Sequence, residues 1–309
     1  MIKWMKSPPV YYALRKHVAR SIRGLQYRKE FHSSGTPKEI VIGLHNQCTR
    51  SCAFCRFGLK KYSNEPPHKM PDSIIAKIIK ELKSIDYTNS IGIGRYSEPM
   101  MDDRLESILL MMSAELPDCK IHFITNGDLA TGEKLEALCG IPTLRRISMS
   151  VYDSEEQYIR FKNMVSECGE NVHAKVRLDR KFAFEDFHVV NKIGELSVKP
   201  DYRLKEWGRS AEPGLLCTEP FRRMMINHDG SVPMCCNILD FAHEDYVMGN
   251  VNNESIMEIW SGERLSTIRN KMTKGGLRSL DACKKCDDYR FCVVTSITKA
   301  VSSSISYYF

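Results

Sequence analysis

The chain has 309 residues, of which 42% are hydrophobic, 27% charged and 9% aromatic. This mixture is typical of a globular protein with one large domain and a smaller one. It excludes collagen-like and disordered chains, and the sequence has no run of about 18 apolar residues that would span a membrane. The net charge is +7, and 12 residues are cysteines.

The positive charge is concentrated at the N-terminus. Residues 1–35 hold eight Lys and Arg residues against one Glu, so the rest of the chain sums to zero. We therefore expect no extended basic surface of the kind that binds nucleic acid. Residues 10–29 predict a helix with an apolar stripe flanked by basic side chains. Such a helix could lie on an anionic membrane, hold an acidic partner or pack against the rest of the protein.

The same segment does not read as a secretory signal, because charged residues interrupt every apolar stretch. Cysteine content, 12 of 309, lies below the roughly 8–10% of small disulfide scaffolds. We therefore expect a cytoplasmic protein with reduced thiols, and clustered cysteines in that compartment usually mark metal or redox chemistry.

Three of these cysteines follow a predicted strand at 39–44. Cys48, Cys52 and Cys55 form a C-x3-C-x2-C pattern, which arises by chance roughly 0.02 times in a chain of this composition. Three thiolates suit a [4Fe–4S] cluster with one iron left open, since a closed cluster takes four. Structural zinc is the alternative, but it usually takes four protein ligands, and no fourth follows nearby.

Predicted strands and helices alternate from residue 39 onward. Strands are expected near 39–44, 90–95, 120–125, 145–152, 172–179 and 197–204, and helices near 72–85, 103–116, 131–139, 154–168 and 185–194. Ser154 and Gln157 form an expected capping box at the start of the fourth helix. Repeated βα units predict an α/β fold with parallel strands inside and helices outside, a partial (β/α)6 TIM-like barrel.

Two of the predicted strands alternate apolar and polar residues. The polar faces hold Arg146, Ser148, Ser150 and Tyr152 on one strand and His173, Lys175, Arg177 and Asp179 on the other. With the apolar faces against the helices, the polar faces would line the barrel interior. An ordinary barrel is filled with Val, Ile and Leu, so we expect a substrate chamber. An internal ion-pair network of Lys175, Arg177 and Asp179 is the alternative.

Turn motifs follow the second and third strands, at the strand ends where the active sites of such barrels lie. Gly92–Pro99 follows the second strand, and Thr125-Asn126-Gly127 follows the third. Ser97 and Glu98 would therefore emerge near the cysteine loop.

A second group of cysteines lies toward the C-terminus. Cys217, Cys235, Cys283 and Cys286 are spaced C-x17-C…C-x2-C, with Cys236 and Cys292 alongside. Four thiolates close an iron–sulfur cluster, and a zinc ribbon satisfies the same spacing. Cys119, Cys139 and Cys168 stand alone in apolar contexts and are expected in the core.

Over residues 37–292 the chain resembles the radical S-adenosylmethionine (SAM) enzymes, through the cysteine triplet with Phe54 before its last member. The resemblance implies that Cys48, Cys52 and Cys55 ligate a [4Fe–4S] cluster whose open iron chelates SAM. Further SAM contacts are implied at Phe54, Ser97, Glu98, Pro99, Asn126, Ser148 and Ser150. Tyr96-Ser97 stands where the family carries two glycines before Glu-Pro.

The C-terminal part resembles a SPASM or "twitch" auxiliary-cluster domain. The pattern is Cys217-x12-Gly230-x4-Cys235, then Gly249-Asn250-Val251, Ile259-Trp260 and Cys283-x2-Cys286-x5-Cys292. It implies one auxiliary [4Fe–4S] cluster on Cys217, Cys235, Cys283 and Cys286, as in aminocyclitol dehydrogenases of this family. Ser296 stands where the full SPASM pattern continues with cysteine.

The resemblance implies SAM cleavage, abstraction of a substrate hydrogen and acceptance of an electron by the auxiliary cluster. Oxidation of an alcohol also needs a base, and Lys175, Arg177 and Tyr152 are the candidates on the predicted polar faces. Alternatively, Cys236 or Cys292 could return a hydrogen atom, which would make the protein an epimerase or maturase of a ribosomal peptide.

We expect three segments: a basic helix at 1–36, the barrel at 37–208 and the auxiliary-cluster domain at 209–309. The 47 residues before Cys48 are too few for a peptide-recognition domain of the kind that some relatives carry, which favours a sugar, an aminocyclitol or another small metabolite. A flavodoxin- or ferredoxin-like electron donor is implied. A non-catalytic zinc-binding adaptor is the alternative from a different class.

Overall fold

The computed structural model describes residues 35–52, 55, 66–180, 215–236, 244–284 and 292–294. They divide into two compact units. One unit comprises the described residues between Thr36 and Arg180 and between Arg223 and Gly262, and the other comprises residues 215–222, 263–284 and 292–294. The expected helices at 10–29 and 185–194 and the strand at 197–204 lie outside the described residues.

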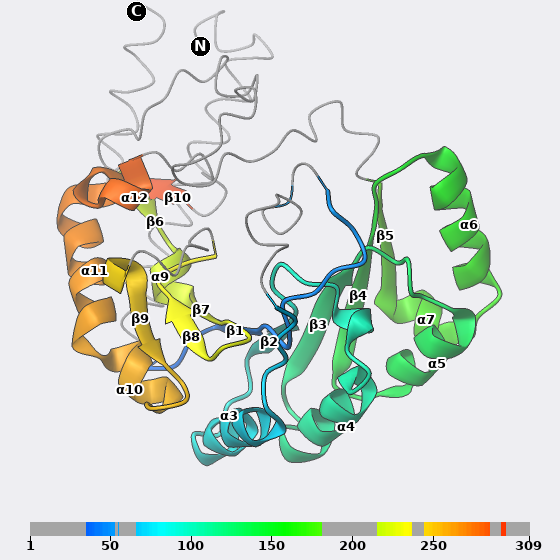
Figure 1. Cartoon of the computed structure of the whole chain (residues 1–309), viewed down its shortest axis with the longest axis horizontal. Coiled ribbons are helices and arrows are strands. Elements are labelled where there is room, and N and C mark those ends of the chain that lie inside the picture. The colour runs from blue at the N-terminus through cyan, green and yellow to red at the C-terminus, as the bar shows by residue number, and fades with distance from the viewer. Residues whose placement is uncertain are drawn as a thin grey trace, which may run out of the picture. The chain divides into compact units, whose positions relative to one another are not determined.

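The first unit is built on a six-stranded sheet in which all neighbouring strands are parallel (Figure 1). The order is β5-β4-β3-β2-β1-β7. The strands are β1 (Glu39–Ile42), β2 (Ser90–Ile93), β3 (Lys120–Thr125), β4 (Leu144–Val151), β5 (Val176–Arg180) and β7 (Arg223–Ile226).

Helices between the strands cover one face of this sheet (Figure 1). They are α3 (Asp72–Ser84), α4 (Leu105–Glu115), α5 (Gly132–Gly140) and α6 (Glu155–Ser166). Helix α3 buries Ile75, Ile78, Ile79 and Leu82, and β3 buries Ile121, Phe123 and Thr125 on the covered face. The prediction of a partial (β/α)6 barrel is confirmed.

The predicted strand at 172–179 is wrong in its first half. Residues Glu170–Lys175 form a short helix, α7, and β5 begins at Val176. The His173 ring contacts the Val165 carbonyl at the end of α6 (Nε2···O 2.8 Å). Four residues of apolar–polar alternation do not distinguish a strand from one turn of helix, so this tertiary contact decides the conformation.

The sixth strand, β7, was not predicted. It comes from the segment after Cys217 and pairs in parallel with β1, with Glu39 opposite Arg223. Its sequence, Arg223-Met224-Met225-Ile226, is too short to show a period. Glu39 also binds Arg223 through its side chain (Oε2 to Nε, 2.6 Å), which fixes this edge of the sheet.

The face of the sheet turned away from the helices carries polar side chains, as expected. The register places Ser148 beside Arg177 and Ser150 beside Asp179. The ion pair found on this face is a different one from the expected network. Glu39 lies 3.1 Å from His122 Nε2 as well as against Arg223, and these contacts hold the pKa of Glu39 low although burial opposes them.

Two further strands extend the first unit beyond β7. β8 (Ser231–Pro233) pairs antiparallel with β9 (Val247–Asn250), and η4 (Glu244–Tyr246) and α10 (Ile256–Ser261) flank β9. The second unit contains β6 (Leu215–Cys217), α9 (Glu219–Arg222), α11 (Glu263–Gly275), η5 (Gly276–Ser279), α12 (Asp281–Lys284) and β10 (Cys292–Val294), with β6 and β10 antiparallel.

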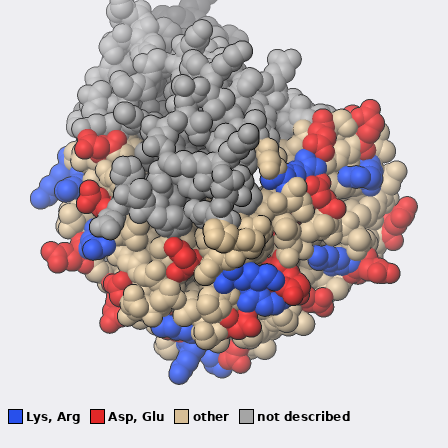
Figure 2. Space-filling model, in the orientation of Figure 1, with Lys and Arg blue, Asp and Glu red and all other residues tan. Residues whose placement is uncertain are grey.

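Charged side chains of both signs are interspersed over the described surface that Figure 2 shows. This agrees with the near-neutral charge of the chain beyond its first 35 residues. Within the described part of the chain, none of the helices is long and apolar enough to cross a membrane.

Candidate cluster and cofactor site

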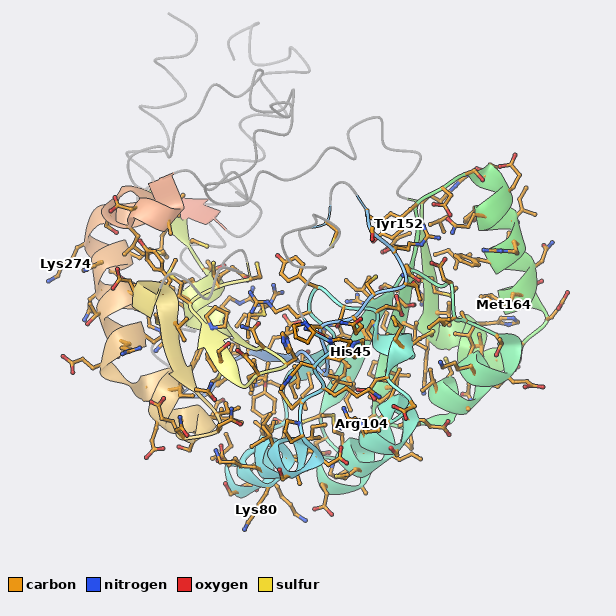
Figure 3. The ribbon with its side chains drawn as sticks, in the orientation of Figure 1. His45, Lys80, Arg104, Tyr152, Met164 and Lys274 are labelled. Carbon is orange, nitrogen blue, oxygen red and sulfur yellow. The ribbon has the colours of Figure 1, made fainter. Side chains whose placement is uncertain are left out.

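The three N-terminal cysteines lie on the loop that follows β1. This loop begins at the buried His45, whose Nδ1 accepts a hydrogen bond from the Gln47 amide (3.0 Å; Figure 3). The thiols of Cys48, Cys52 and Cys55 are partly exposed and form no disulfide. They can therefore receive iron from solvent.

The sulfur of Cys48 accepts two N–H hydrogen bonds. One comes from the Arg50 amide (3.5 Å) and the other from Asn126 Nδ2 (3.7 Å). Hydrogen bonds to ligand sulfurs are typical of iron–sulfur sites, where they tune the reduction potential. Burial raises the pKa of the Cys48 and Cys52 thiols, so binding of iron there must release protons.

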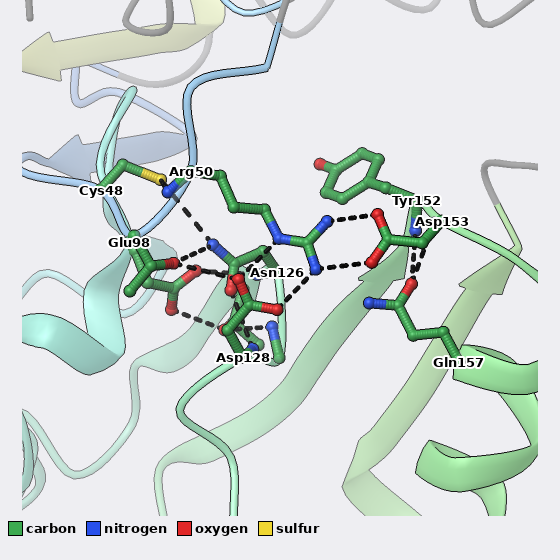
Figure 4. Close-up of polar contacts among 11 residues, drawn as sticks. Cys48, Arg50, Glu98, Asn126, Asp128, Tyr152, Asp153 and Gln157 are labelled. Atoms are coloured by element: carbon green, nitrogen blue, oxygen red, sulfur yellow. Dashed lines mark hydrogen bonds and ion pairs between the residues drawn. The ribbon is translucent and has the colours of Figure 1, made fainter.

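Arg50 joins the cysteine loop to two strand ends (Figure 4). Its Nε and Nη2 donate to Asp128 after β3 (2.6 and 2.5 Å), and its Nη1 and Nη2 donate to Asp153 after β4 (2.7 and 2.9 Å). These carboxylates raise the pKa of Arg50, and Arg50 lowers the pKa of Asp128. The guanidinium carbon lies 5.8 Å from the centroid of the Tyr152 ring.

The contact of Arg50 with Asp128 and Asp153 does not follow from the sequence alone. The sequence does contain a pattern that could have indicated this contact. An arginine stands inside the cysteine pattern, and an aspartate follows each of two successive strands. The acidic partners lie 78 and 103 residues from Arg50 along the chain, so their pairing depends on the strand order.

Glu98 is buried beside this loop. Its amide donates to the Gln47 carbonyl (2.9 Å), directly before Cys48. Its carboxylate accepts from Thr125 Oγ1 (2.6 Å), the Asn126 amide (2.8 Å) and the Met100 amide (3.1 Å). Burial raises the pKa of Glu98 against the effect of these donors. Glu98 thus holds the ends of β2 and β3 together, and its expected contact with SAM stays a prediction.

Tyr96 and Gly94 give the loop after β2 its shape. Gly94 has φ +88°, and a Cβ there would lie 2.5 Å from Pro99, so this position requires glycine. Tyr96 has φ +53°, in the left-handed region where glycine is favoured. Tyr96 therefore stands in a backbone conformation that glycine adopts more easily, at a cost in strain.

Ser148, Ser150 and Tyr152 come from β4 and the residue directly after its end. Ser148 and Ser150 are buried, and the Ser150 side chain hydrogen-bonds to Tyr152. Gln157 Oε1 accepts from the amides of Tyr152 (2.9 Å) and Asp153 (3.0 Å). The glutamine of the expected capping box therefore bonds to the two residues before Ser154. Burial raises the pKa of Tyr152, with a further rise from the neighbouring cysteines, so its phenol is protonated at neutral pH.

Lys175 lies in a place that does not suit the expected role as a base. Its ammonium donates to the carbonyls of Cys139 (2.6 Å) and Ile141 (2.9 Å) at the end of α5. Lys175 directly precedes β5 at the edge where strands begin, whereas the cysteine loop follows the end of β1. Arg177 is the second residue of β5 and donates to the His173 and Val176 carbonyls (3.2 and 2.8 Å).

The Lys175→Gln variant is therefore expected to lose stability and keep activity. Loss of the cation that caps α5 should lower the free energy of unfolding by about 1 kcal/mol. Urea denaturation measures this change, with the exposed Lys162→Gln as the control. A large fall in SAM cleavage by folded Lys175→Gln protein would restore Lys175 as a catalytic candidate.

The C-terminal cysteines fall on several elements. Cys235 and Cys236 follow β8 and are partly exposed. Cys217 ends β6, Cys283 is buried in α12, and Cys292 stands opposite Cys217 in the β6–β10 pairing. Phe54 and Cys286 lie outside the described residues. Cys119 and Cys139 are buried as expected, whereas Cys168 is partly exposed.

Among the residues that the structure describes, no three His, Cys, Asp or Glu side chains lie close enough together to hold a single metal ion. A [4Fe–4S] cluster sets a different requirement, because each of its thiolates binds a different iron. The unpaired, partly exposed thiols of the cysteine loop and the N–H donors on Cys48 fit such a group.

Two family models match the chain. Residues 42–187 match the Radical SAM superfamily, and residues 217–287 match SPASM, an iron–sulfur cluster-binding domain. A curated relative, the S-adenosyl-L-methionine-dependent 2-deoxy-scyllo-inosamine dehydrogenase of Niallia circulans, is 22% identical over 250 residues. That match covers 81% of this chain and 92% of the relative.

Solved structures share the fold. BtrN in complex with AdoMet and 2-DOIA has a TM-score of 0.66 at 21% identity, covering 84% of this chain and 96% of BtrN. Streptococcus suis SuiB bound to S-adenosylmethionine has a TM-score of 0.56 at 19% identity, covering 91% and 78%. Native anSMEcpe with bound AdoMet has a TM-score of 0.56 at 12% identity, covering 87% and 96%.

Proposed function

This chain belongs to the radical SAM superfamily and carries a SPASM iron–sulfur domain, and we propose that it is a dehydrogenase of a sugar, an aminocyclitol or a similar small metabolite. The observation that carries the proposal is the match to a dehydrogenase of 2-deoxy-scyllo-inosamine over 92% of that protein's length. The polar face of the sheet, with Ser148, Ser150, Arg177 and Asp179, supports a hydroxyl-rich substrate.

The cofactors of these two domains are iron–sulfur clusters and SAM. We assign the SAM-binding [4Fe–4S] cluster to Cys48, Cys52 and Cys55. The assigned ligands of the auxiliary [4Fe–4S] cluster are Cys217, Cys235, Cys283 and Cys286. The SAM contacts that we assign are Phe54, Ser97, Glu98, Pro99, Asn126, Ser148 and Ser150.

When bound, the first cluster and SAM would supply the removal of a hydrogen atom from the substrate, with 5′-deoxyadenosine as the product. A flavodoxin- or ferredoxin-like protein in a reducing cytoplasm would supply the electron for SAM cleavage. The substrate carbinol would lose that hydrogen atom and give its hydroxyl proton to a base of this chain, and the auxiliary cluster, when bound, would serve as the acceptor of the remaining electron. The substrate thus loses two hydrogens and becomes a ketone.

The proton-handling groups are assigned from the geometry of β4 and β5. Burial raises the pKa of Tyr152, which keeps its phenol protonated. Tyr152 therefore suits hydrogen-bond donation to a substrate oxygen. Asp179, partly buried and in register with Ser150, is a carboxylate on the same face and suits the role of base.

The test is anaerobic incubation of the reconstituted protein with a reductant and SAM, adding aminocyclitols, sugars and peptides in turn. We expect substrate-dependent release of 5′-deoxyadenosine and a product two hydrogens lighter, detected by mass spectrometry. A product whose mass is unchanged in ordinary water, and which carries one solvent deuterium when the reaction is run in heavy water, would establish the epimerase alternative, for which Cys236 and Cys292 are the candidates. Colourless protein with zinc and no iron would establish a zinc-binding adaptor.

A further inference from the structure

The loop from Gly94 to Pro99 contacts the segment that carries Cys235 and Cys236. Arg95 Nη2 lies 3.3 Å from the carbonyl oxygens of both cysteines and donates to them. The Tyr96 hydroxyl donates to the Cys236 carbonyl (2.9 Å). Side chains of two successive residues therefore hold the backbone of the two cysteines.

The other end of the same loop contacts the first cysteine loop. The Glu98 amide donates to the Gln47 carbonyl (2.9 Å), and the Glu98 carboxylate accepts from the Asn126 amide (2.8 Å). Asn126 in turn donates to the sulfur of Cys48. Four consecutive residues, 95–98, therefore link the segment of Cys235 to the segment of Cys48.

Arg95 also contacts the segment that precedes β8. Its Nη1 donates to Asn227 Oδ1. Asn227 is fixed by two hydrogen bonds to Ser231, from its amide to the Ser231 carbonyl and from Nδ2 to Ser231 Oγ (both 2.9 Å). Ser231 begins β8, and Cys235 is the second residue after the end of that strand. The guanidinium thus contacts the segments on both sides of β8.

The charge of Arg95 faces the sulfur-bearing residues. Arg95 is partly buried, and Cys235 and Cys236 are among the groups with which its charge interacts. Burial lowers the pKa of Arg95, but a guanidinium stays charged in proteins. A fixed positive charge stabilises the reduced form of a neighbouring cluster, because reduction adds a negative charge, and it therefore raises the reduction potential.

We propose that Arg95 and Tyr96 are positioning residues for the auxiliary cluster, and that the charge of Arg95 makes this cluster a better acceptor for the substrate's electron. The proposal rests on the proposed role of Cys235 as a cluster ligand. It also gives a reason for the tyrosine at position 96, where its hydroxyl contact with Cys236 offsets the strain of a left-handed backbone.

The test compares variants of the anaerobically reconstituted holoenzyme by EPR-monitored redox titration. For Arg95→Gln we expect the ratio of reduced to oxidised auxiliary cluster at a fixed potential to fall about tenfold, a shift of about 59 mV for one electron. Tyr96→Phe keeps the charge and should keep the potential, while releasing the iron of the auxiliary cluster faster to a chelator. An unchanged potential in Arg95→Gln overturns the proposed effect of charge.

Lys77→Gln is the matched control. The Lys77 ammonium also donates to two backbone carbonyls of the C-terminal segment, those of Val251 and Glu254 (both 2.7 Å), which belong to no cysteine. It should leave the potential of the auxiliary cluster at the wild-type value. A shift equal to that of Arg95→Gln would mean that any loss of charge in this unit lowers the potential, which contradicts the proposal.

Further variants separate this inference from the proposed function. Cys235→Ala should lose about four iron atoms per chain, and full iron content would overturn the ligand assignment itself. If Arg95→Gln does not fold, Arg95→Lys decides the question, since one ammonium cannot replace all the contacts of the guanidinium. If a chelator removes iron faster from the auxiliary cluster of Arg95→Lys than from that of the wild type, while the first cluster is unaffected, the positioning role is supported. Equal rates of iron release from the auxiliary cluster in the two proteins overturn it.

Discussion

Replacing Cys48, Cys52 and Cys55 together by Ala is expected to abolish SAM cleavage, reducing 5′-deoxyadenosine release to the level of a protein-free control. The physical reason is that cleavage needs an electron delivered at a cluster with an open iron. The proposed ligands of that cluster are these three cysteines, on the loop that follows β1. The variant should still fold, because all three side chains are partly exposed and lie outside the core. Liquid chromatography with mass spectrometry measures 5′-deoxyadenosine and methionine together.

Cys168→Ala is the control for general effects of thiol removal. Its thiol is also partly exposed, but it contacts the Met164 carbonyl at the end of α6 (3.2 Å). We expect this variant to keep wild-type cleavage. Residual SAM-dependent release by the triple variant above the protein-free level would contradict the assignment of the first cluster.

The second large effect is expected from Arg50→Met, which should lower the rate of SAM cleavage by about 10–100-fold. Arg50 lies between Cys48 and Cys52, two of the proposed cluster ligands, and holds their loop against Asp128 and Asp153 with four hydrogen bonds. Methionine keeps much of the side-chain volume but leaves both carboxylates without this cation. The loop that carries the cysteines then loses its attachment to the ends of β3 and β4.

Arg50→Lys should recover part of the loss, because a lysine keeps the charge but does not form the planar, two-sided contact. Lys83→Met is the control, since Lys83 forms an exposed ion pair with Glu115 (2.7 Å) outside this loop, and such pairs contribute little. Iron content and cleavage rate are measured in parallel. Wild-type values in Arg50→Met would show that the loop keeps its geometry without Arg50.

The fold of the barrel could be predicted because its elements follow hydrophobic periodicity. Helix α3 was expected at 72–85 and is found at Asp72–Ser84, and β3 matches the expected range 120–125. The errors are short elements whose conformation depends on contacts distant in sequence. Helix α7 is fixed by His173 and Lys175 against neighbouring helices, and β7 is fixed by pairing with β1.

Only the parts of the candidate site that follow from the spacing of residues along the sequence could be predicted. The cysteine triplet and the turn at Ser97-Glu98-Pro99 were visible in the sequence. The partners of Arg50 were not, because the order of strands brings them together across the sheet. The polar face was expected, but its ion pair joins Glu39 on β1 to Arg223 on β7, a strand that was not predicted.

We propose that this chain carries two iron–sulfur clusters, one for SAM and one as an internal electron acceptor. Iron counting after anaerobic reconstitution tests it most directly, comparing the wild type with the Cys48/Cys52/Cys55→Ala variant. We expect about eight iron atoms per wild-type chain and about four per variant chain. About four in the wild type and none in the variant would contradict it, since no auxiliary cluster would then exist.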